Sequence, residues 1–158
     1  MHRGVSRRGL LRGVAAVAGL AGVGAAAGCD LFGGNTGPDE SDVPPELIEL
    51  LTATVALGDA YDNAIAKAPS LSGLLTAPRD AARAHAQALA QALNKPAPQG
   101  ATPGAGQGDP TALLAGLVDA ETKGEDAART ACLSAPPRLA PLVGSIAAAR
   151  ACHLEILR

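Results

Sequence analysis

The sequence predicts an all-α fold, and three observations lead to that prediction. The chain of 158 residues contains one Phe, one Tyr and no Trp, although 47% of it is hydrophobic. Most of its apolar side chains are Ala and Leu, which favour helices, whereas β-branched and aromatic residues favour strands. Apolar residues also recur at alternating intervals of three and four, which is the spacing of one helix face. These features disfavour a sandwich, a barrel and a Rossmann sheet.

Residues 1–28 are predicted to be an export signal. Arg7 and Arg8 precede an uncharged stretch over residues 14–27, which is too short and too rich in Gly and Ala for a comfortable transmembrane span. Residues 6–12 (SRRGLLR) resemble the twin-arginine export signal, which implies that the protein crosses the membrane already folded.

The signal ends in the residues AAGC (26–29), which resemble a bacterial lipobox. This resemblance implies that Cys29 is lipidated and becomes the first residue of the mature chain. Two acyl chains suffice for stable anchoring, so we expect the protein on the extracytoplasmic face of the cell membrane. Residues 29–44 are rich in Gly, Pro and acidic residues and predict a flexible tether. The abundance of Gly, Ala and Arg beside such a signal suggests an actinobacterial source.

The charge of the mature chain argues against a nucleic-acid partner. Without the four arginines of the leader, 9 of the 13 Lys and Arg residues remain against 15 Asp and Glu, a net charge of −6. An acidic surface of this kind does not bind a phosphate backbone. The scarcity of aromatic residues also leaves no stacking platform for single strands.

Two helices are predicted in the first half of the domain. The first begins at Pro45 and ends before the residues APS (68–70). After that turn, the same apolar spacing continues over residues 71–92. We expect Pro78 to break or kink the first two turns of this second helix, so that its regular part begins at Arg79.

Two further helices are predicted in the second half. Residues 95–109 form a low-complexity stretch, expected to be a disordered loop. Asp109 is expected to cap a helix that begins at Pro110, and the residues SAPP (134–137) turn the chain into the last helix. Two helical hairpins joined by one long connection predict a four-helix bundle with a crossover over residues 45–158.

This two-hairpin plan carries a family resemblance. Residues 56–75 (ALGDAYDNAIAKAPSLSGLL) and 139–157 (LAPLVGSIAAARACHLEIL) resemble exported ferritin-like domains of unknown function found in actinobacteria. The likeness covers residues 45–158 and implies a ferritin-like four-helix bundle. It does not by itself imply an active di-iron centre.

Both Glu-x-x-His motifs of the di-iron ferritin-like proteins are absent. Arg150 stands three residues before His153, and Ala82 stands three residues before His85. Oxidase or peroxidase activity is therefore not expected. The predicted function is a non-catalytic binding or structural module of the cell envelope, whose partner is an unidentified envelope protein or small ligand. A homodimer is an open alternative.

A transition-metal site is the alternative function. Counting residues from the two turns places His85, Glu121 and His153 near one level of the bundle, where they could hold zinc, iron or copper. The competing interpretation makes each His an ordinary core residue, bonded to Glu121 or to a hydroxyl such as that of Thr54. The second interpretation is favoured, and no cofactor is expected. Tyr61 is expected to be a core residue whose hydroxyl reaches the surface.

Cys132 and Cys152 are candidates for a disulfide, because exported cysteine pairs usually form one. Hairpin geometry opposes it. Residue 152 should face about residue 120, which leaves Cys132 about 18 Å further along the helix at 1.5 Å per residue. A bridge needs Cα atoms within about 7 Å, so the pairing stays open. A catalytic thiol is not expected, because neither cysteine is predicted to lie at a basic helix terminus.

Overall fold

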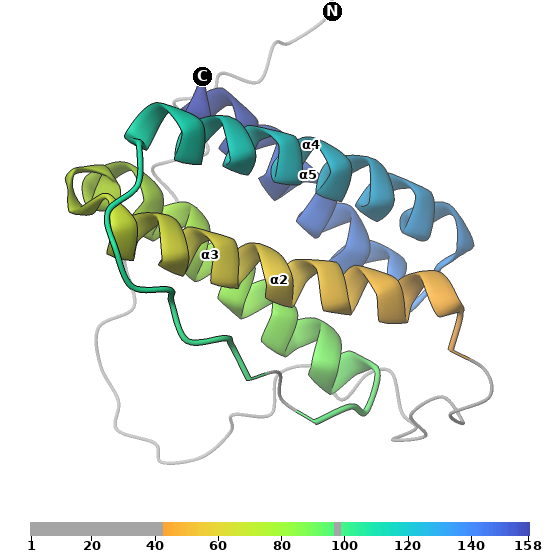
Figure 1. The fold of residues 1–158 in the computed structure, drawn as a ribbon. Coiled ribbons are helices and arrows are strands. Elements are labelled where there is room, and N and C mark those ends of the chain that lie inside the picture. The colour runs from red at the N-terminus through yellow and green to blue at the C-terminus, as the bar shows by residue number, and fades with distance from the viewer. Residues whose placement is uncertain (1–42, 97–98) are drawn as a thin grey trace, which may run out of the picture. The chain divides into compact units, whose positions relative to one another are not determined.

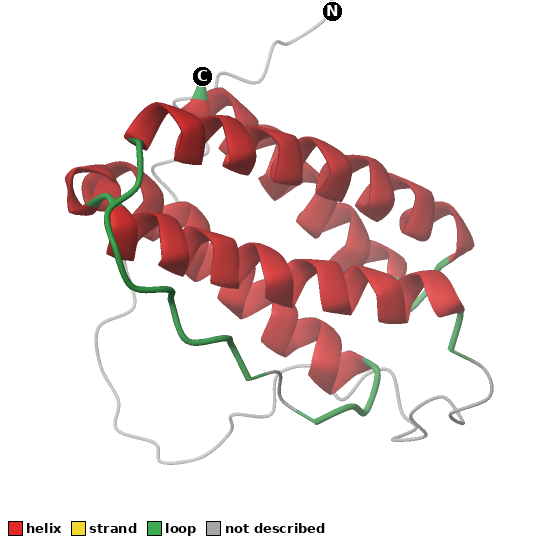
Figure 2. Cartoon of the chain, in the orientation of Figure 1, coloured by secondary structure: helices red, strands yellow, loops and turns green. Residues whose placement is uncertain are grey.

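The described residues, 43–96 and 99–158 of this computed structural model, form an all-helical domain. They contain the helices α2 (Pro45–Lys67), α3 (Ser72–Ala92), α4 (Pro110–Ser134) and α5 (Ala140–Leu157), with the short 3-10 helix η2 (Pro69–Leu71) between α2 and α3. Figure 2 shows helices and loops and no strand in this part of the chain. The all-α prediction is confirmed. The predicted export signal with Arg7 and Arg8, the lipidation site Cys29 and most of the tether lie outside the described residues.

The helices pack as two hairpins. α2 packs on α3 and α4 packs on α5, while α2 also contacts α4 and α3 contacts α5 (Figure 1). α4 begins beside the end of α2, where the N–H of Gly108 donates to the carbonyl oxygen of Lys67 at 3.1 Å. The connection between the hairpins therefore returns along the bundle before α4 starts.

Local signals account for most of the helix bounds. α2 begins at Pro45 and ends at Lys67, as predicted. The side chain of Asp109 caps α4 by accepting from the backbone N–H groups of Thr111 at 3.4 Å and Ala112 at 3.0 Å. Pro110 occupies the first position of that helix, where its missing N–H costs nothing.

The predicted break at Pro78 is wrong. α3 runs without interruption from Ser72 to Ala92, with Pro78 inside it. Leu75, Pro78 and Ala82 are all buried and recur at helical spacing on the inner face. Packing on both sides of the proline therefore holds the helix, although the nitrogen of Pro78 cannot donate a hydrogen bond.

The described part of the crossover, residues 99–109, is held against α2 and is not the disordered loop that composition predicts. Three of its N–H groups donate to positions one turn apart on α2: Ala101 to Asp59 at 2.9 Å, Gly104 to Asn63 at 3.2 Å, and Gly108 to Lys67 at 3.1 Å. Gly100 also fits closely, since a Cβ there would lie 2.7 Å from Oδ1 of Asp59. The low-complexity sequence of the crossover does not reveal this contact, because its hydrogen-bond partners lie on α2.

The core consists of two apolar clusters. One contains Leu47, Leu50, Leu89, Leu93, Ala128, Ala131, Leu139, Val143 and Ile146. The other contains Leu57, Tyr61, Ala64, Leu75, Ala82, Leu117 and Leu157. Four buried polar residues lie at intermediate positions along α2, α4 and α5: Thr54, Glu121, Arg150 and His153. The bundle therefore has a polar layer between its two apolar ends.

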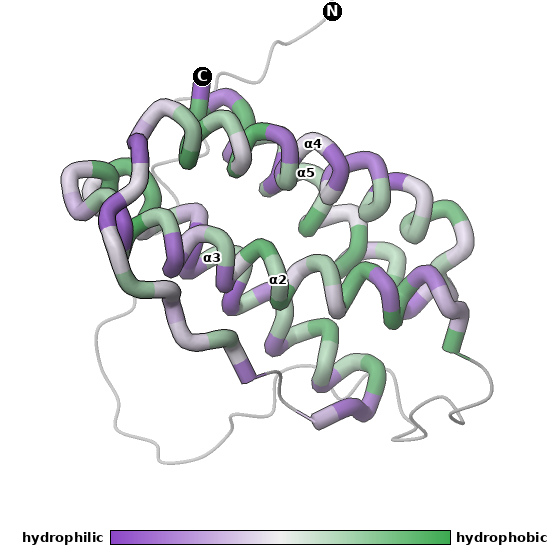
Figure 3. The backbone as a smooth tube through the Cα atoms, in the orientation of Figure 1, coloured by the Kyte–Doolittle hydropathy of each residue, from purple (hydrophilic) through white to green (hydrophobic). Residues whose placement is uncertain are grey.

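Among the described residues, α5 alone is long and apolar enough to cross a membrane by length and composition. Figure 3 shows the hydrophobic colouring along α5. Val143, Ile146, Leu154 and Leu157 are buried in the bundle, and Arg150 and His153 are buried with them. This pattern is typical of a core helix, because both polar side chains find partners inside the protein.

Candidate functional site

The polar layer is centred on Glu121, a carboxylate of α4 with 0% of its surface exposed. Its Oε1 accepts a hydrogen bond from the hydroxyl of Tyr61 at 2.6 Å and lies 2.8 Å from Nδ1 of His153. Tyr61 comes from α2 and His153 from α5, and the two rings meet edge to face with centroids 6.5 Å apart. Three helices are thus joined through one carboxylate oxygen.

Arg150 supplies the positive charge of the layer. Its Nη1 lies 3.5 Å from Oε2 of Glu121, and its Nη2 donates to Oγ1 of Thr54 at 2.9 Å. Thr54 in turn donates to the carbonyl oxygen of Leu50 at 2.6 Å. The Nε of Arg150 is buried without a hydrogen-bond partner. The guanidinium has five N–H donors and makes two hydrogen bonds, so it retains unused donor capacity.

Gly124 makes room for this guanidinium. A Cβ at that position would lie 2.8 Å from Cζ of Arg150, closer than real side chains approach. The side chain of Arg150 leaves α5, passes the backbone of α4 at Gly124, and reaches Thr54 on α2. The absence of a side chain at residue 124 is therefore part of the site.

Burial sets the protonation of the surrounding groups. Burial, and then the hydrogen bond and the charge of Glu121, raise the pKa of Tyr61 far above its usual range, so its hydroxyl stays a donor. Burial lowers the pKa of Arg150, while Glu121 raises it. Burial also lowers the pKa of His85, and the electrostatic effect of His153 and Arg150 lowers it further.

The three residues predicted as metal ligands do not form a metal site. Glu121 and His153 are in contact, but His85, on α3, has no hydrogen bond to either. Among the described residues, no group of three His, Cys, Asp or Glu side chains could hold a metal ion. Both oxygens of Glu121 have protein partners, and the guanidinium of Arg150 would repel a second cation. This donor set does not fit the di-iron centre of ferritin-like proteins.

The layer differs from the sequence predictions at two more residues. The hydroxyl of Tyr61 does not reach the surface, because it is used by Glu121 in the core. The sequence motif marks Arg150 only as the residue that replaces the Glu of a Glu-x-x-His pattern. A recognisable signal was present, since Arg150 shares helical spacing with Ile146 and His153 on an otherwise uncharged face.

The two cysteines of the bundle are free, so the disulfide is not formed. The Sγ of Cys132 lies 3.6 Å from the carbonyl oxygen of Ala140, at the start of α5. Cys152 is exposed and lies further along α5 by about 18 Å at 1.5 Å per residue. The hairpin geometry therefore keeps the two cysteines apart.

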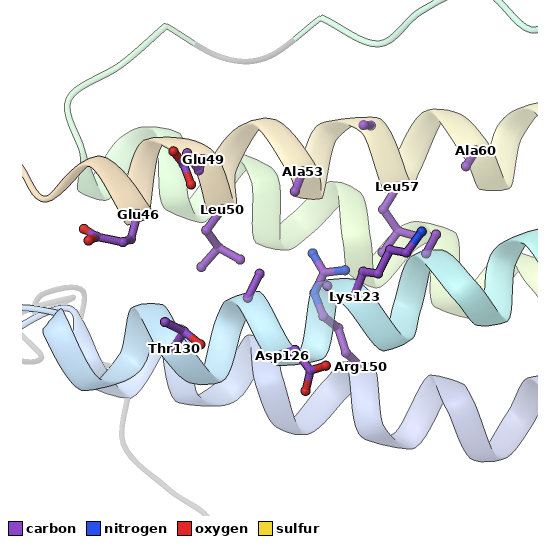
Figure 4. A pocket seen from close by; sticks show the side chains of 14 residues that line it. Glu46, Glu49, Leu50, Ala53, Leu57, Ala60, Lys123, Asp126, Thr130 and Arg150 are labelled. Atoms are coloured by element: carbon purple, nitrogen blue, oxygen red, sulfur yellow. The ribbon is translucent and has the colours of Figure 1, made fainter.

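A groove lies between α2 and α4 on the outer side of the polar layer (Figure 4). Its volume is about 630 Å³. The apolar lining consists of Leu50, Ala53, Ala56, Leu57, Ala60, Ala120 and Ala127. Glu46, Glu49, Asp126 and Thr130 also line it, together with Lys123, Gly124 and Arg150. Volume and lining are those of a small-molecule site, which is mostly apolar with a few polar groups.

Two cations enter this groove. Figure 4 shows Lys123 extending from α4 toward Leu57 on α2, while the guanidinium of Arg150 points into the same gap between α2 and α4. Lys123 makes no ion pair with another described residue. Glu46 and Glu49 belong to the start of α2, at the other end of the groove. The groove therefore has a cationic middle and an acidic end.

Comparison with known proteins identifies no relative. No protein-family model matches the chain, and neither the characterised proteins nor the solved structures contain a significant match.

Proposed function

We propose that this protein is a non-catalytic binding module, held at the extracytoplasmic face of the cell membrane by a lipid on Cys29, with its ligand site in the α2–α4 groove. The groove is the observation that carries the proposal. It joins apolar walls to a buried cation with unused donors, Arg150, and to a free one, Lys123. Such a combination of apolar surface and few polar groups is the usual composition of a ligand site.

The proposed fold type is ferritin-like. Two antiparallel helical hairpins joined by one long crossover are the arrangement of that fold class. In ferritin-like di-iron proteins, carboxylates and His residues of the bundle centre hold metal. Here Tyr61, His153 and Arg150 satisfy the central carboxylate of Glu121, which supports a structural role for the layer and leaves ligand binding to the groove.

Membrane attachment is tested with the full chain in a bacterium that has twin-arginine export. We expect wild-type protein to incorporate radiolabelled palmitate and to sediment with membranes. Cys29→Ser should abolish the label, and Arg7→Lys with Arg8→Lys should block export. Wild-type protein that is unlabelled and soluble would contradict the proposed anchor.

Use of the groove is tested by native mass spectrometry of the exported full chain. We expect a non-covalent small-molecule adduct that is lost on denaturation, unlike the acyl groups on Cys29. Ala127→Phe should remove the adduct, because residue 127 lines the groove and is exposed. Ala84→Phe, at an exposed position of α3, is the matched control. An adduct that survives Ala127→Phe would show that the groove is not the site.

A further inference from the structure

We propose that the α2–α4 groove binds a free fatty acid, with the carboxylate at Arg150 and Lys123 and the acyl chain along the alanine-rich walls. This inference rests on the proposed function and names its ligand class. It starts from Arg150, which is 2% exposed and whose Nε has no partner. Arg150 also lines the groove, and its Nη1 and Nη2 each use one of their two N–H groups on Glu121 and Thr54, which leaves donors for a bound carboxylate.

The charge at the middle of the groove, where Lys123 and Arg150 lie, favours an anion. Glu121 compensates Arg150 through the 3.5 Å contact, so the remaining uncompensated charge beside it is that of Lys123. Both side chains point into the gap between α2 and α4 (Figure 4). A carboxylate placed there gains charge-assisted hydrogen bonds from a guanidinium and an ammonium. A neutral head group of the same length lacks that gain.

The other charges of the groove restrict the ligand to one negative group. Glu46 and Glu49 would repel a second carboxylate at the start of α2, and the carboxylate of Asp126 points away from α2 in Figure 4. A dicarboxylate is therefore disfavoured. A ligand with one carboxylate can place it at Lys123 and Arg150, and its uncharged tail is not repelled by the acidic end of the groove.

The walls suit a flexible alkyl chain. The lining on α2 runs from Glu46 to Ala60, about 21 Å at 1.5 Å per residue. Between the acidic end and the cations the walls present Leu50, Ala53 and Ala127. Small side chains leave a channel that accommodates methylene groups, and each buried methylene increases affinity about fourfold.

The test is isothermal titration calorimetry on the full chain carrying Cys29→Ser, which removes the proposed acylation site and allows work without detergent. The probes are decanoate, 1-decanol and decylammonium. We expect saturable one-to-one binding of decanoate, about tenfold or more tighter than that of 1-decanol, because only the acid engages both cations. Octanoate, which is two methylenes shorter, should bind about fifteenfold more weakly than decanoate.

Two further substitutions locate the site. Lys123→Glu should weaken decanoate binding about tenfold, and Ala127→Phe should abolish it. Arg138→Glu, a charge reversal at an exposed residue outside the groove, and Ala84→Phe should leave it unchanged. Neither Lys123 nor Ala127 is buried, so both variants are expected to fold.

The fatty-acid proposal is overturned if decanoate does not bind, if 1-decanol or decylammonium binds equally well, or if Lys123→Glu has no effect. The native mass spectra separate that result from failure of the proposed function. A groove-dependent adduct that is not a carboxylate would refute the fatty acid and retain the binding module, whereas no adduct and no decanoate binding would refute both.

Discussion

The guanidinium of Arg150 packs directly on the backbone of Gly124, so that a Cβ at residue 124 would lie 2.8 Å from Cζ of the arginine. This approach lets a side chain of α5 pass α4 and donate to Thr54 on α2. A single side-chain atom at residue 124 would therefore disturb contacts between three helices.

Gly124→Ala should destabilise the protein by about 1–3 kcal/mol, because the added methyl displaces a buried guanidinium. Urea unfolding measures the free-energy change. Gly116→Ala, on the same helix, is the matched control: a Cβ there meets nothing within 4 Å, so the higher helix propensity of Ala should stabilise by about 0.5–1 kcal/mol. Equal effects of the two substitutions would contradict the proposed packing role of Gly124.

The buried pair of Glu121 and Arg150 should be strongly coupled. Glu121→Gln leaves Arg150 buried without its counter-charge and should lower the free energy of unfolding by about 3–5 kcal/mol. Replacing both residues by Met should recover most of that loss, because two apolar side chains of similar volume need no partner. A double variant no more stable than Glu121→Gln would show that charge compensation is not the cause.

Arg83 should hold the crossover in place. It bonds to Asp59 at 2.8 Å and to Asp62, both on α2, and its guanidinium adjoins Gly100. Arg83→Ala should lower the free energy of unfolding by less than about 1 kcal/mol, because the ion pairs of Arg83 with Asp59 and Asp62 are partly exposed. Cleavage of residues 99–109 by proteinase K should nevertheless become several times faster.

The control for the crossover is Arg129→Ala, which removes an exposed pair with Glu125 on α4. It should leave the rate of cleavage within residues 99–109 at the wild-type value. If Arg83→Ala is cleaved no faster than this control, the contact between Arg83 and the crossover does not protect residues 99–109 from cleavage.

His85 should make stability depend on pH. Its pKa is lowered from 6.5 in the folded state, by burial first and then by the electrostatic effect of His153 and Arg150, with Glu121 opposing. The unfolded state therefore binds more protons, and the contribution of His85 is complete above pH 6.5 and is lost as the pH falls below it. In urea unfolding, wild-type protein should lose more stability between pH 7.5 and pH 5 than His85→Gln. Equal losses would contradict the shift.

Transition metals should not stabilise the bundle. Zn²⁺ or Fe²⁺ in tenfold excess should leave the thermal midpoint unchanged, because the oxygens of Glu121 are engaged and Arg150 repels cations. The metal content of the full-length protein, purified without chelator, provides a second measurement. Metal near one equivalent that is lost on His153→Ala would revive the alternative site of His85, Glu121 and His153.

Helix bounds were predictable where a strong local signal was present. Pro45 begins α2 and Pro110 begins α4 after the cap Asp109, as the sequence indicates. Residues 135–139 separate α4 from α5, which overlaps the predicted turn at 134–137. Counting from the turns also brings Glu121 and His153 together, because antiparallel helices in a hairpin keep a regular register.

Tertiary packing decided what local signals could not. The sequence alone determined the four helical segments and the two hairpins, which depend on residue type and near-neighbour spacing; the export signal stays a prediction. Only the structure decided that α3 passes through Pro78, that the crossover binds α2, and that Arg150 completes the polar layer beside the groove. Each of these features depends on contacts between residues that are distant in the chain. Burial in those contacts changes the free energy of the groups involved, and the composition of the sequence does not show which groups will be buried.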